Sequence, residues 1–336
     1  MKRALQYIIS IGLTVVFLVV AFRGTDYHKL TEAMLSANYL WIAVSFAFLV
    51  ASHVVRSVRW RYFLAPVKAG IPLRPLVSGV MIGYLMNNVM PRLGELARPY
   101  ALARMEHIPA SSAVGTVIIE RILDIVTFLV LVAVLPLLYK GPLLETFPWL
   151  VPGGIVVSVT ITLSLAVMMT LMIRRDWMDR VIDKVRTILP ASMSDKLSGW
   201  AHAFLDGGLS LLRPGQFLGI SLLTLLVWGL YALMTYAAFF AFHLEDVLDF
   251  RAAIVVLTIS SIGVAIPTPG GTGSYHILTA RSLTKLFQVA PSVALSYATV
   301  THAASFLGIS LIGIYFVWRD QPGFKAIMRE DEVSST

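Results

Sequence analysis

Long uninterrupted apolar runs constrain this chain more than any other feature. A helix needs about 20 apolar residues, at 1.5 Å each, to cross a hydrocarbon layer about 30 Å thick. Runs of this kind lie at about residues 4–22, 40–58, 110–138, 150–173, 216–242 and 292–318. Hydrophobic residues make up 57% of the chain and charged residues 14%, so one soluble core could not bury the apolar excess. The sequence predicts an all-α polytopic membrane protein.

Two further apolar stretches, at about 75–90 and 252–266, are shorter and end in sequence rich in Pro and Gly. Lys and Arg gather after the second long run and, most strongly, at 174–213. Basic loops face the cytoplasm under the positive-inside rule. A complete crossing at 75–90 would place the most basic loop outside. We therefore predict about six full transmembrane helices and two re-entrant helical hairpins, near 75–107 and 252–289.

The predicted elements occur twice in the order span, span, hairpin, span, first in residues 1–138 and again in 139–318. The first copy begins in the cytoplasm and the second begins outside, which is the pattern of an inverted repeat in transporters. Both termini, including a tail at 319–336, are then cytoplasmic. Amphipathic stripes in the cytoplasmic loop 174–213 predict helices that lie on the membrane surface or pack against the ends of the spans.

The net charge of +8 does not indicate nucleic-acid binding, because the Lys and Arg residues lie in loops between apolar runs. Attraction to anionic lipid headgroups accounts for this distribution. The chain has no cysteine, which excludes disulfides and thiol chemistry. The first apolar run is longer than that of a signal peptide, and Ala21-Phe22-Arg23 is a poor cleavage site. We therefore predict an uncleaved, multi-pass protein of the cell inner (cytoplasmic) membrane.

The first predicted hairpin contains helix-breaking residues at membrane depth. Pro91 and Gly94 interrupt the helix and free backbone groups that lipid cannot satisfy. The break is therefore expected to face protein or a wet cavity. Asn87 and Asn88 supply neutral donors and acceptors beside it. The alternative is a purely structural turn.

Three charged residues lie at and after this break. Arg92 and Arg98 suit two-pronged recognition of a phosphate or carboxylate. Glu95 is expected to pair with Arg98, three residues later, or to move a proton. The alternative is snorkelling of the arginines toward the membrane interface.

The second predicted hairpin has three glycines within four residues. Its break comprises Pro267, Pro269, Gly270, Gly271, Gly273, Ser274 and His276. Glycines permit positive φ angles and close backbone approach, and a helix beginning near Ser274 would point its amide groups at an anion. A Walker phosphate loop is excluded because no Gly-Lys-Ser/Thr follows. Tight helix packing is the alternative explanation for the glycines.

Glu120, Arg121 and Asp124 form a charged group near the start of the third predicted span. Ionisable groups at membrane depth are costly, so they indicate a functional site and each needs a partner. The candidate partners are Arg56, Arg59, Arg92 and Arg98. The alternative is a structural ion-pair network that holds the hairpin to the span.

No pattern in the sequence indicates catalysis or a bound cofactor. His53 and His302 are single histidines on predicted spans, and such residues more often pack and hydrogen-bond than carry protons. No spacing matches a set of metal ligands, and no Ser, His and Asp set is evident. We therefore expect no catalytic residue, no metal and no cofactor.

Three ordered motifs resemble those of the lysylphosphatidylglycerol synthase transmembrane-region family, also described as UPF0104 integral membrane proteins. The motifs are Pro-Arg-x-Gly-Glu-x-x-Arg at 91–98, Glu-Arg-x-x-Asp at 120–124 and Pro-x-Pro-Gly-Gly-x-Gly at 267–273. The resemblance covers nearly the whole chain. It implies similarity to the flippase part of bifunctional proteins that attach lysine to phosphatidylglycerol and move the product between leaflets.

The resemblance implies transport without synthesis. In the bifunctional proteins aminoacyl transfer resides in a soluble C-terminal domain, whereas this chain ends about 18 residues after its last predicted span. The family's last motif usually continues to a glutamate near the position of His276. An acidic proton carrier is therefore not implied at that position, although a histidine can titrate near neutral pH.

Our first hypothesis is a flippase that moves an anionic or phosphate-bearing lipid, including aminoacylated or polyprenyl lipids, between leaflets. The headgroup would bind between the hairpins, near Arg92, Arg98 and the amide groups of 270–274, while the two repeats rock to alternate access. The expected partners are anionic membrane phospholipids. The alternatives are a non-transporting accessory protein for an envelope biosynthetic enzyme and an intramembrane lipid-modifying enzyme.

Overall fold

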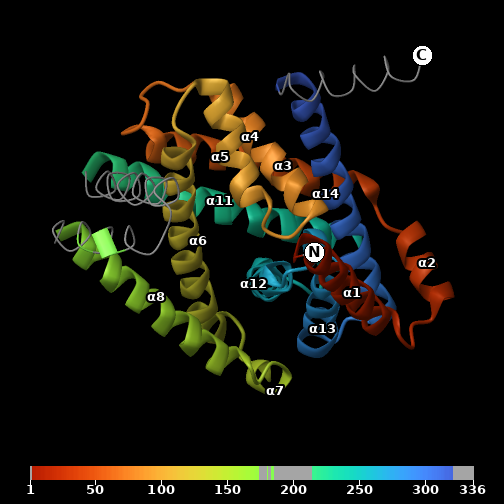
Figure 1. Ribbon diagram of the computed structural model, residues 1–336. Coiled ribbons are helices and arrows are strands. Elements are labelled where there is room, and N and C mark those ends of the chain that lie inside the picture. Colours follow the sequence, from red (N-terminus) through yellow and green to blue (C-terminus); the bar gives the residue numbers. More distant parts are fainter. Residues whose placement is uncertain (1, 174–179, 181–182, 185–213, 321–336) are drawn as a thin grey trace, which may run out of the picture.

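The computed structural model describes residues 2–173, 180, 183–184 and 214–320 (Figure 1). The predicted amphipathic helices of 174–213 and nearly all of the predicted tail at 319–336 lie outside the described residues. Within the described ranges, every regular element is a helix. The all-α prediction is therefore confirmed for this part of the chain.

Each predicted apolar run corresponds to a helix with similar bounds, whereas α2 and α7 lie outside the predicted runs. In chain order the helices are α1 (Lys2–Phe22), α2 (Tyr27–Leu35), α3 (Tyr39–Leu64), α4 (Leu73–Val89), α5 (Gly94–Glu106), α6 (Ala110–Leu138), α7 (Leu143–Thr146), α8 (Leu150–Ile173), α11 (Pro214–Ala241), α12 (Phe250–Ala265), the 3-10 turn η1 (Pro269–Gly271), α13 (Ser274–Phe287) and α14 (Pro291–Asp320).

Four of the described helices, α3, α6, α11 and α14, are long and apolar enough to cross a membrane. The α1 and α2 pair provides a fifth span if it is counted as one bent unit, with an angle of 94° between its helices. Shorter apolar helical stretches lie at Leu150–Leu163 and Phe250–Ala265. The chain is therefore a helical membrane protein, and the exact number of complete spans stays a prediction.

The bend between α1 and α2 has a local cause. Gly24 adopts a φ of +74°, which ends α1, and Asp26 then caps α2 by accepting hydrogen bonds from the backbone N–H groups of His28 and Lys29. The redirected helix packs on α14, where the Ser296 hydroxyl donates to the Leu30 carbonyl at 2.9 Å. The N-terminal segment therefore reaches the C-terminal half of the fold.

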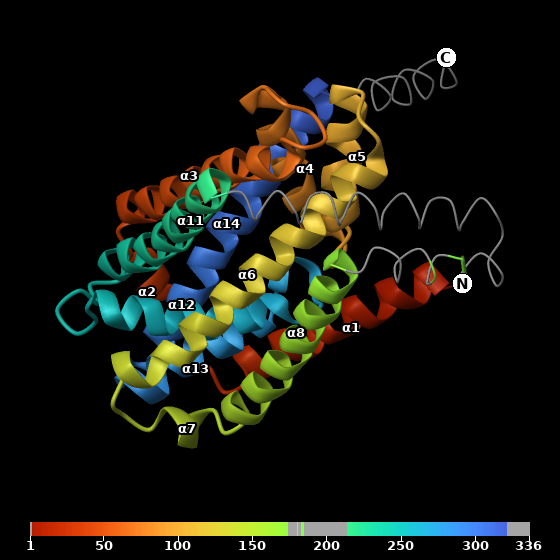
Figure 2. The ribbon, with the colours of Figure 1, turned by 90° about the vertical axis from the view of Figure 1, so that its left-hand side faces the viewer.

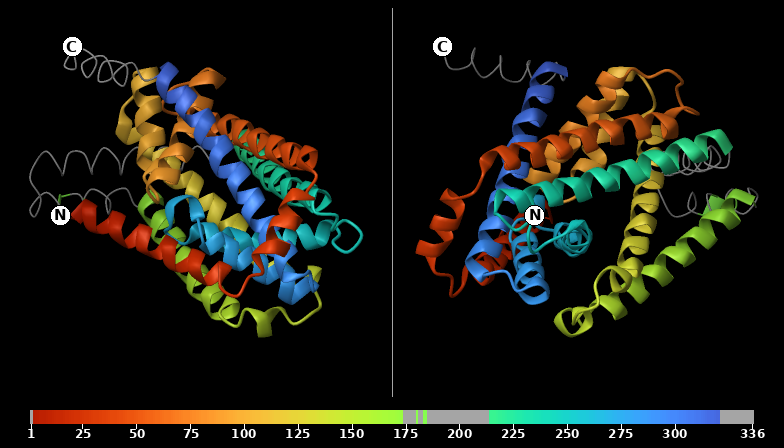
Figure 3. Two further views of the ribbon diagram at one scale, coloured as in Figure 1. Left: turned by 90° about the vertical axis from the view of Figure 1, so that its right-hand side faces the viewer. Right: turned by 180° about the vertical axis from the view of Figure 1, so that it is seen from behind.

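Helices α3 and α11 lie side by side along one face of the molecule (Figure 2 and Figure 3). The Ser45 hydroxyl on α3 donates to the Met234 carbonyl on α11 at 2.8 Å. Each of these two helices also packs against the helix that follows it, α4 or α12. Each of the paired helices thus contacts the first helix of one broken segment.

The two broken segments fold back on themselves as helical hairpins, α4 against α5 and α12 against α13. A glycine permits the close approach in each. A Cβ atom at Gly94 would collide with the Gly83 carbonyl oxygen, and a Cβ atom at Gly263 would lie 2.9 Å from the Ser274 carbonyl oxygen. Both positions therefore need a residue without a side chain.

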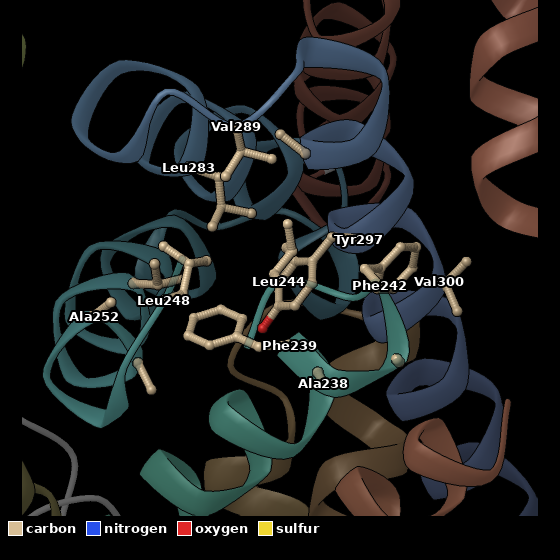
Figure 4. Close-up of a cluster of buried hydrophobic side chains, with 14 of the residues drawn as sticks. Ala238, Phe239, Phe242, Leu244, Leu248, Ala252, Leu283, Val289, Tyr297 and Val300 are labelled. Carbon is tan, nitrogen blue, oxygen red and sulfur yellow. The ribbon is translucent and has the colours of Figure 1, made fainter. Parts of the chain in front are cut away.

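A buried apolar cluster fixes the second hairpin to the end of α11 and the start of α14 (Figure 4). The Phe239 ring of α11 and the Phe242 ring just after its end lie 5.7 and 5.6 Å from the Tyr297 ring of α14. Leu283 of α13 packs into the same cluster and is fully buried. Burial of this apolar surface holds the second break in a defined position.

Candidate functional site

The first break has an unusual backbone that positions its polar residues. Helix α4 ends before Met90, and Arg92 adopts a φ of +64°, a left-handed conformation that is rare for a residue with a side chain. Pro91 and Arg92 form the turn, and α5 begins at Gly94. The Asn87 carboxamide oxygen accepts the Gly94 N–H at 2.7 Å, which closes the turn.

The two breaks meet through Asn88. Its carboxamide nitrogen donates to the Phe306 carbonyl at 3.2 Å and to the Ser310 hydroxyl at 2.9 Å, both on α14. A Cβ atom at Gly270 would lie 2.9 Å from the Asn88 carboxamide oxygen. The turn of the first hairpin therefore touches the glycine-rich turn of the second, although the two residues are far apart in the sequence.

The second break uses its glycines as predicted from their conformational freedom. Gly270, Gly271 and Gly273 have φ angles of +58°, +76° and +89°. Pro267 precedes the turn and Pro269 starts η1. The Ser274 hydroxyl donates to the Gly263 carbonyl at 2.6 Å, which ties the start of α13 to α12.

The N-terminus of α13 packs against α1. A Cβ atom at Gly273 would lie 2.6 Å from the Phe17 Cβ atom of α1, and Ser274 and His276 are buried. The Gly273 N–H donates to the His276 Nδ1 atom at 3.3 Å. Some of the amide groups that were expected to point at an anion therefore donate hydrogen bonds to acceptors within the protein.

The structure adds His302 to the second break, a residue that sequence reasoning left as a packed histidine. The His302 Nε2 atom lies 3.1 Å from the Gly270 carbonyl oxygen, and its ring centroid is 4.8 Å from that of His276. The Tyr275 and Thr301 hydroxyls, 3.1 Å apart, join the same α13–α14 contact. Only the packing of α14 on α13 could reveal this pair.

A buried ion network joins α3 to α6. Arg56 Nη1 lies 2.7 Å from Glu120 Oε1 and 2.8 Å from Asp124 Oδ2. Arg59 Nη2 lies 3.2 Å from Glu120 Oε1 and 2.7 Å from Asp124 Oδ1. Residues three and four apart share one helix face, so the two arginines oppose the two carboxylates directly. The prediction that Arg56 and Arg59 pair with these carboxylates is confirmed.

The first hairpin enters the same network through Arg98. Its Nη1 and Nη2 atoms lie 3.1 and 2.9 Å from the two oxygens of Glu120, which confirms this predicted pair. Its guanidinium also stacks 3.9 Å from the Trp60 ring centroid. One carboxylate therefore holds α3, α5 and α6 together.

Two of the expected pairs are wrong. Glu95 pairs with Arg121 at 2.9 Å instead of with Arg98, because Arg98 points to Glu120. Arg92 is exposed at the turn, and its side chain forms no ion pair with any described residue. Arg92 therefore leaves its positive charge available.

The network carries a surplus of positive charge. Arg56, Arg59 and Arg98 are no more than 4% exposed, and their carboxylate partners among the described residues are Glu120 and Asp124, which are at most 8% exposed. The half-buried pair of Arg121 and Glu95 is neutral as a unit. A buried net charge of +1 favours an anion nearby.

Sequence reasoning missed the contribution of α11 to this network. The Arg59 Nη1 atom donates to the Thr224 hydroxyl at 3.0 Å, and the Arg56 Nη2 atom donates to the Tyr231 hydroxyl at 3.4 Å. Neither residue stands out in an apolar helix.

In the parts of the chain that the structure describes, no cluster of His, Asp and Glu could hold a metal ion.

Comparisons with known proteins find similar membrane proteins. UPF0104 membrane proteins of Pyrococcus horikoshii and Methanothermobacter thermautotrophicus are 25% and 24% identical to the chain; each match covers 94% of it and 96% or 95% of the relative. A UPF0104 membrane protein of Methanocaldococcus jannaschii is 26% identical over 36% of this chain and 37% of its own length. No solved structure matches. The family model of the lysylphosphatidylglycerol synthase TM region matches residues 7–313, so the chain belongs to that family.

Proposed function

We propose that the protein moves an anionic, phosphate-bearing lipid between the two leaflets of the membrane. The observation that carries the proposal is the contact between the two helix breaks, Asn88 against Gly270, in a protein whose helices α3, α5 and α6 hold a buried network with a surplus positive charge. Broken helices that meet between two repeats are where transporters bind their substrates. The headgroup would bind at this junction while the acyl chains stay in lipid.

Arg92 is the first residue that we expect to contact the headgroup. Its left-handed backbone places the guanidinium at the turn of the first hairpin, and it is exposed and free of ion pairs within the described residues. A guanidinium binds phosphate through two parallel hydrogen bonds. The buried arginines would contribute their field without breaking their own pairs.

The repeated contacts of the two halves support an inverted repeat. Helix α3 packs on α4 as α11 packs on α12, and α5 packs on α6 as α13 packs on α14. Across the halves, α4 contacts α14 and α12 contacts α6. Two similar units that exchange contacts in this way would allow rocking and alternating access.

The six-span topology with two re-entrant hairpins is part of the proposal. It places the end of α5 in the cytoplasm and the loop between α11 and α12 outside. The chain has no cysteine, so single cysteines at Arg104 and Asp246, both exposed, can be labelled selectively. An impermeant maleimide added to intact cells should label Asp246→Cys and spare Arg104→Cys. The reverse labelling would refute the topology.

The transport proposal is tested in liposomes that contain fluorescent phosphatidylglycerol. We expect the wild type to exchange the lipid between leaflets faster than protein-free vesicles do. Arg92→Ala should slow exchange about tenfold or more, because a hydrogen bond to a charged group is worth about 1.5–3 kcal/mol. Arg104→Ala is the matched control on the same hairpin, and Arg92→Lys should retain part of the rate.

A wild-type rate equal to that of protein-free vesicles would refute lipid transport. In that case a stable enzyme that co-purifies with the protein would indicate an accessory role in envelope lipid or glycan synthesis. A changed mass of the added lipid would indicate an intramembrane enzyme instead. We expect the lipid to be recovered unmodified.

A further inference from the structure

The histidine pair at the second break is not used by the headgroup contacts described above. His276 on α13 is 4% exposed, and His302 on α14 is half-buried with its ring centroid 4.8 Å away. His302 Nε2 contacts the carbonyl of Gly270, the residue that touches Asn88 of the first hairpin. The pair therefore lies at the junction of the two hairpins.

The hydrogen bonds assign different protonation chemistry to the two rings. His276 Nδ1 accepts the Gly273 N–H, so a proton added at Nδ1 would break that bond. His302 must donate its Nε2–H to the Gly270 carbonyl, which leaves Nδ1 with a lone pair and no partner among the described residues. A proton added to His302 at Nδ1 keeps the Gly270 bond and gives it a charged donor. His302 is therefore the better proton acceptor.

The described residues around the two histidine rings leave room for the charge of one proton and include no negative side chain to balance it. The groups that face the pair are Phe22 from α1, Tyr275 from α13, Phe306 from α14 and, through Gly270, Asn88 from α4. None of them is charged, and apart from the two histidines themselves no acidic or basic side chain of the described residues interacts with either ring. Two imidazolium rings this close would repel each other. Among the described residues the Gly270 carbonyl alone would interact favourably with that proton, so an anion that comes from outside the protein would stabilise it further.

We propose, on the basis of the lipid transport proposed above, that the His276–His302 pair binds one proton together with each anionic headgroup, held at His302 Nδ1. The headgroup supplies the negative charge that the site lacks, and the proton strengthens the contact between His302 and Gly270. Proton and lipid therefore bind cooperatively, and by reciprocity each raises the affinity for the other. Movement of the lipid is coupled to the proton gradient.

A binding experiment tests the proton site without requiring transport. Short-chain phosphatidylglycerol or phosphatidylcholine is added to the purified, weakly buffered protein near neutral pH, and a pH-indicator dye measures proton uptake. The wild type should take up about one proton per chain with phosphatidylglycerol and close to none with phosphatidylcholine. Equal uptake with both lipids, or no uptake with either, would overturn the proposal.

Matched variants locate the proton. His302→Gln keeps an N–H donor for Gly270 and removes the titratable nitrogen, so uptake should be lost. His28→Gln changes an exposed histidine on α2, far from the pair in the sequence, and should retain uptake. Retained uptake in His302→Gln would refute the assignment. The wild-type comparison of the two lipids stands even if a variant does not fold.

Transport separates the two proposals. Wild-type exchange should rise by up to about tenfold per pH unit as the pH falls through the range where the site is mostly empty. His302→Gln should remain above protein-free vesicles and become insensitive to pH. Transport with the same pH dependence in both proteins would refute proton coupling and leave lipid transport intact. Proton uptake without transport would support the site and refute the flippase function.

Discussion

Glu120 is the residue whose loss we expect to destabilise the protein most. It accepts from Arg56, Arg59 and Arg98 and is completely buried. Among the described residues, Glu120→Gln would leave Arg56 and Arg59 with Asp124 as their one buried carboxylate and Arg98 with none. Removal of one partner from a buried ion pair costs about 3–5 kcal/mol. For a chain of 336 residues, 1 kcal/mol shifts the melting temperature by about 1.4 °C, so it should fall by about 4–7 °C.

The assay is thermal unfolding in detergent, followed by the fraction of protein that still elutes as a single species after heating. Glu120→Gln combined with Arg98→Gln restores the original charge difference, so the double variant should recover part of the loss. Lys29→Ala removes an exposed ion pair with Asp26 and should shift the melting temperature by no more than about 2 °C. A Glu120→Gln melting temperature within about 2 °C of wild type would refute the reasoning.

Three further predictions concern the backbone of the two breaks. Gly94→Ala should destabilise the first hairpin because its Cβ atom meets the Gly83 carbonyl. Gly12→Ala is the control, because a Cβ atom there has no atom within 4 Å. Equal thermal stability of the two variants would contradict the packing. Gly273→Ala should weaken the packing of α1, measured as faster proteolysis of the N-terminal segment. Gly24→Ala is the control, because Gly24 also has a positive φ but its Cβ atom would meet no other atom. Equal rates of proteolysis in the two variants would refute a role for the contact with Phe17. Asn88→Ala should lower lipid exchange more than stability, whereas unchanged exchange would remove Asn88 from the site.

The sequence was sufficient for the features that depend on local pattern. Apolar runs of a given length become helices in lipid because the backbone must satisfy its own hydrogen bonds, and the described helices follow those runs closely. The breaks at Pro91 and Gly270 were also readable, since proline and glycine act on their own backbone. The cost of burying Glu120 likewise predicted that it would find arginine partners.

Tertiary structure alone decided which side chains meet. Several arginines were available, and only the packing of α3 and α5 on α6 selects Arg98 for Glu120 and leaves Glu95 to Arg121. Likewise, His302 resembles any packed histidine until α14 brings it to His276. The physical reason is that a helix determines the spacing of its own residues, whereas the partner across an interface depends on how distant helices fit together. Apolar length and helix breaks therefore follow from the sequence, and the ion network and the histidine pair follow from the fold.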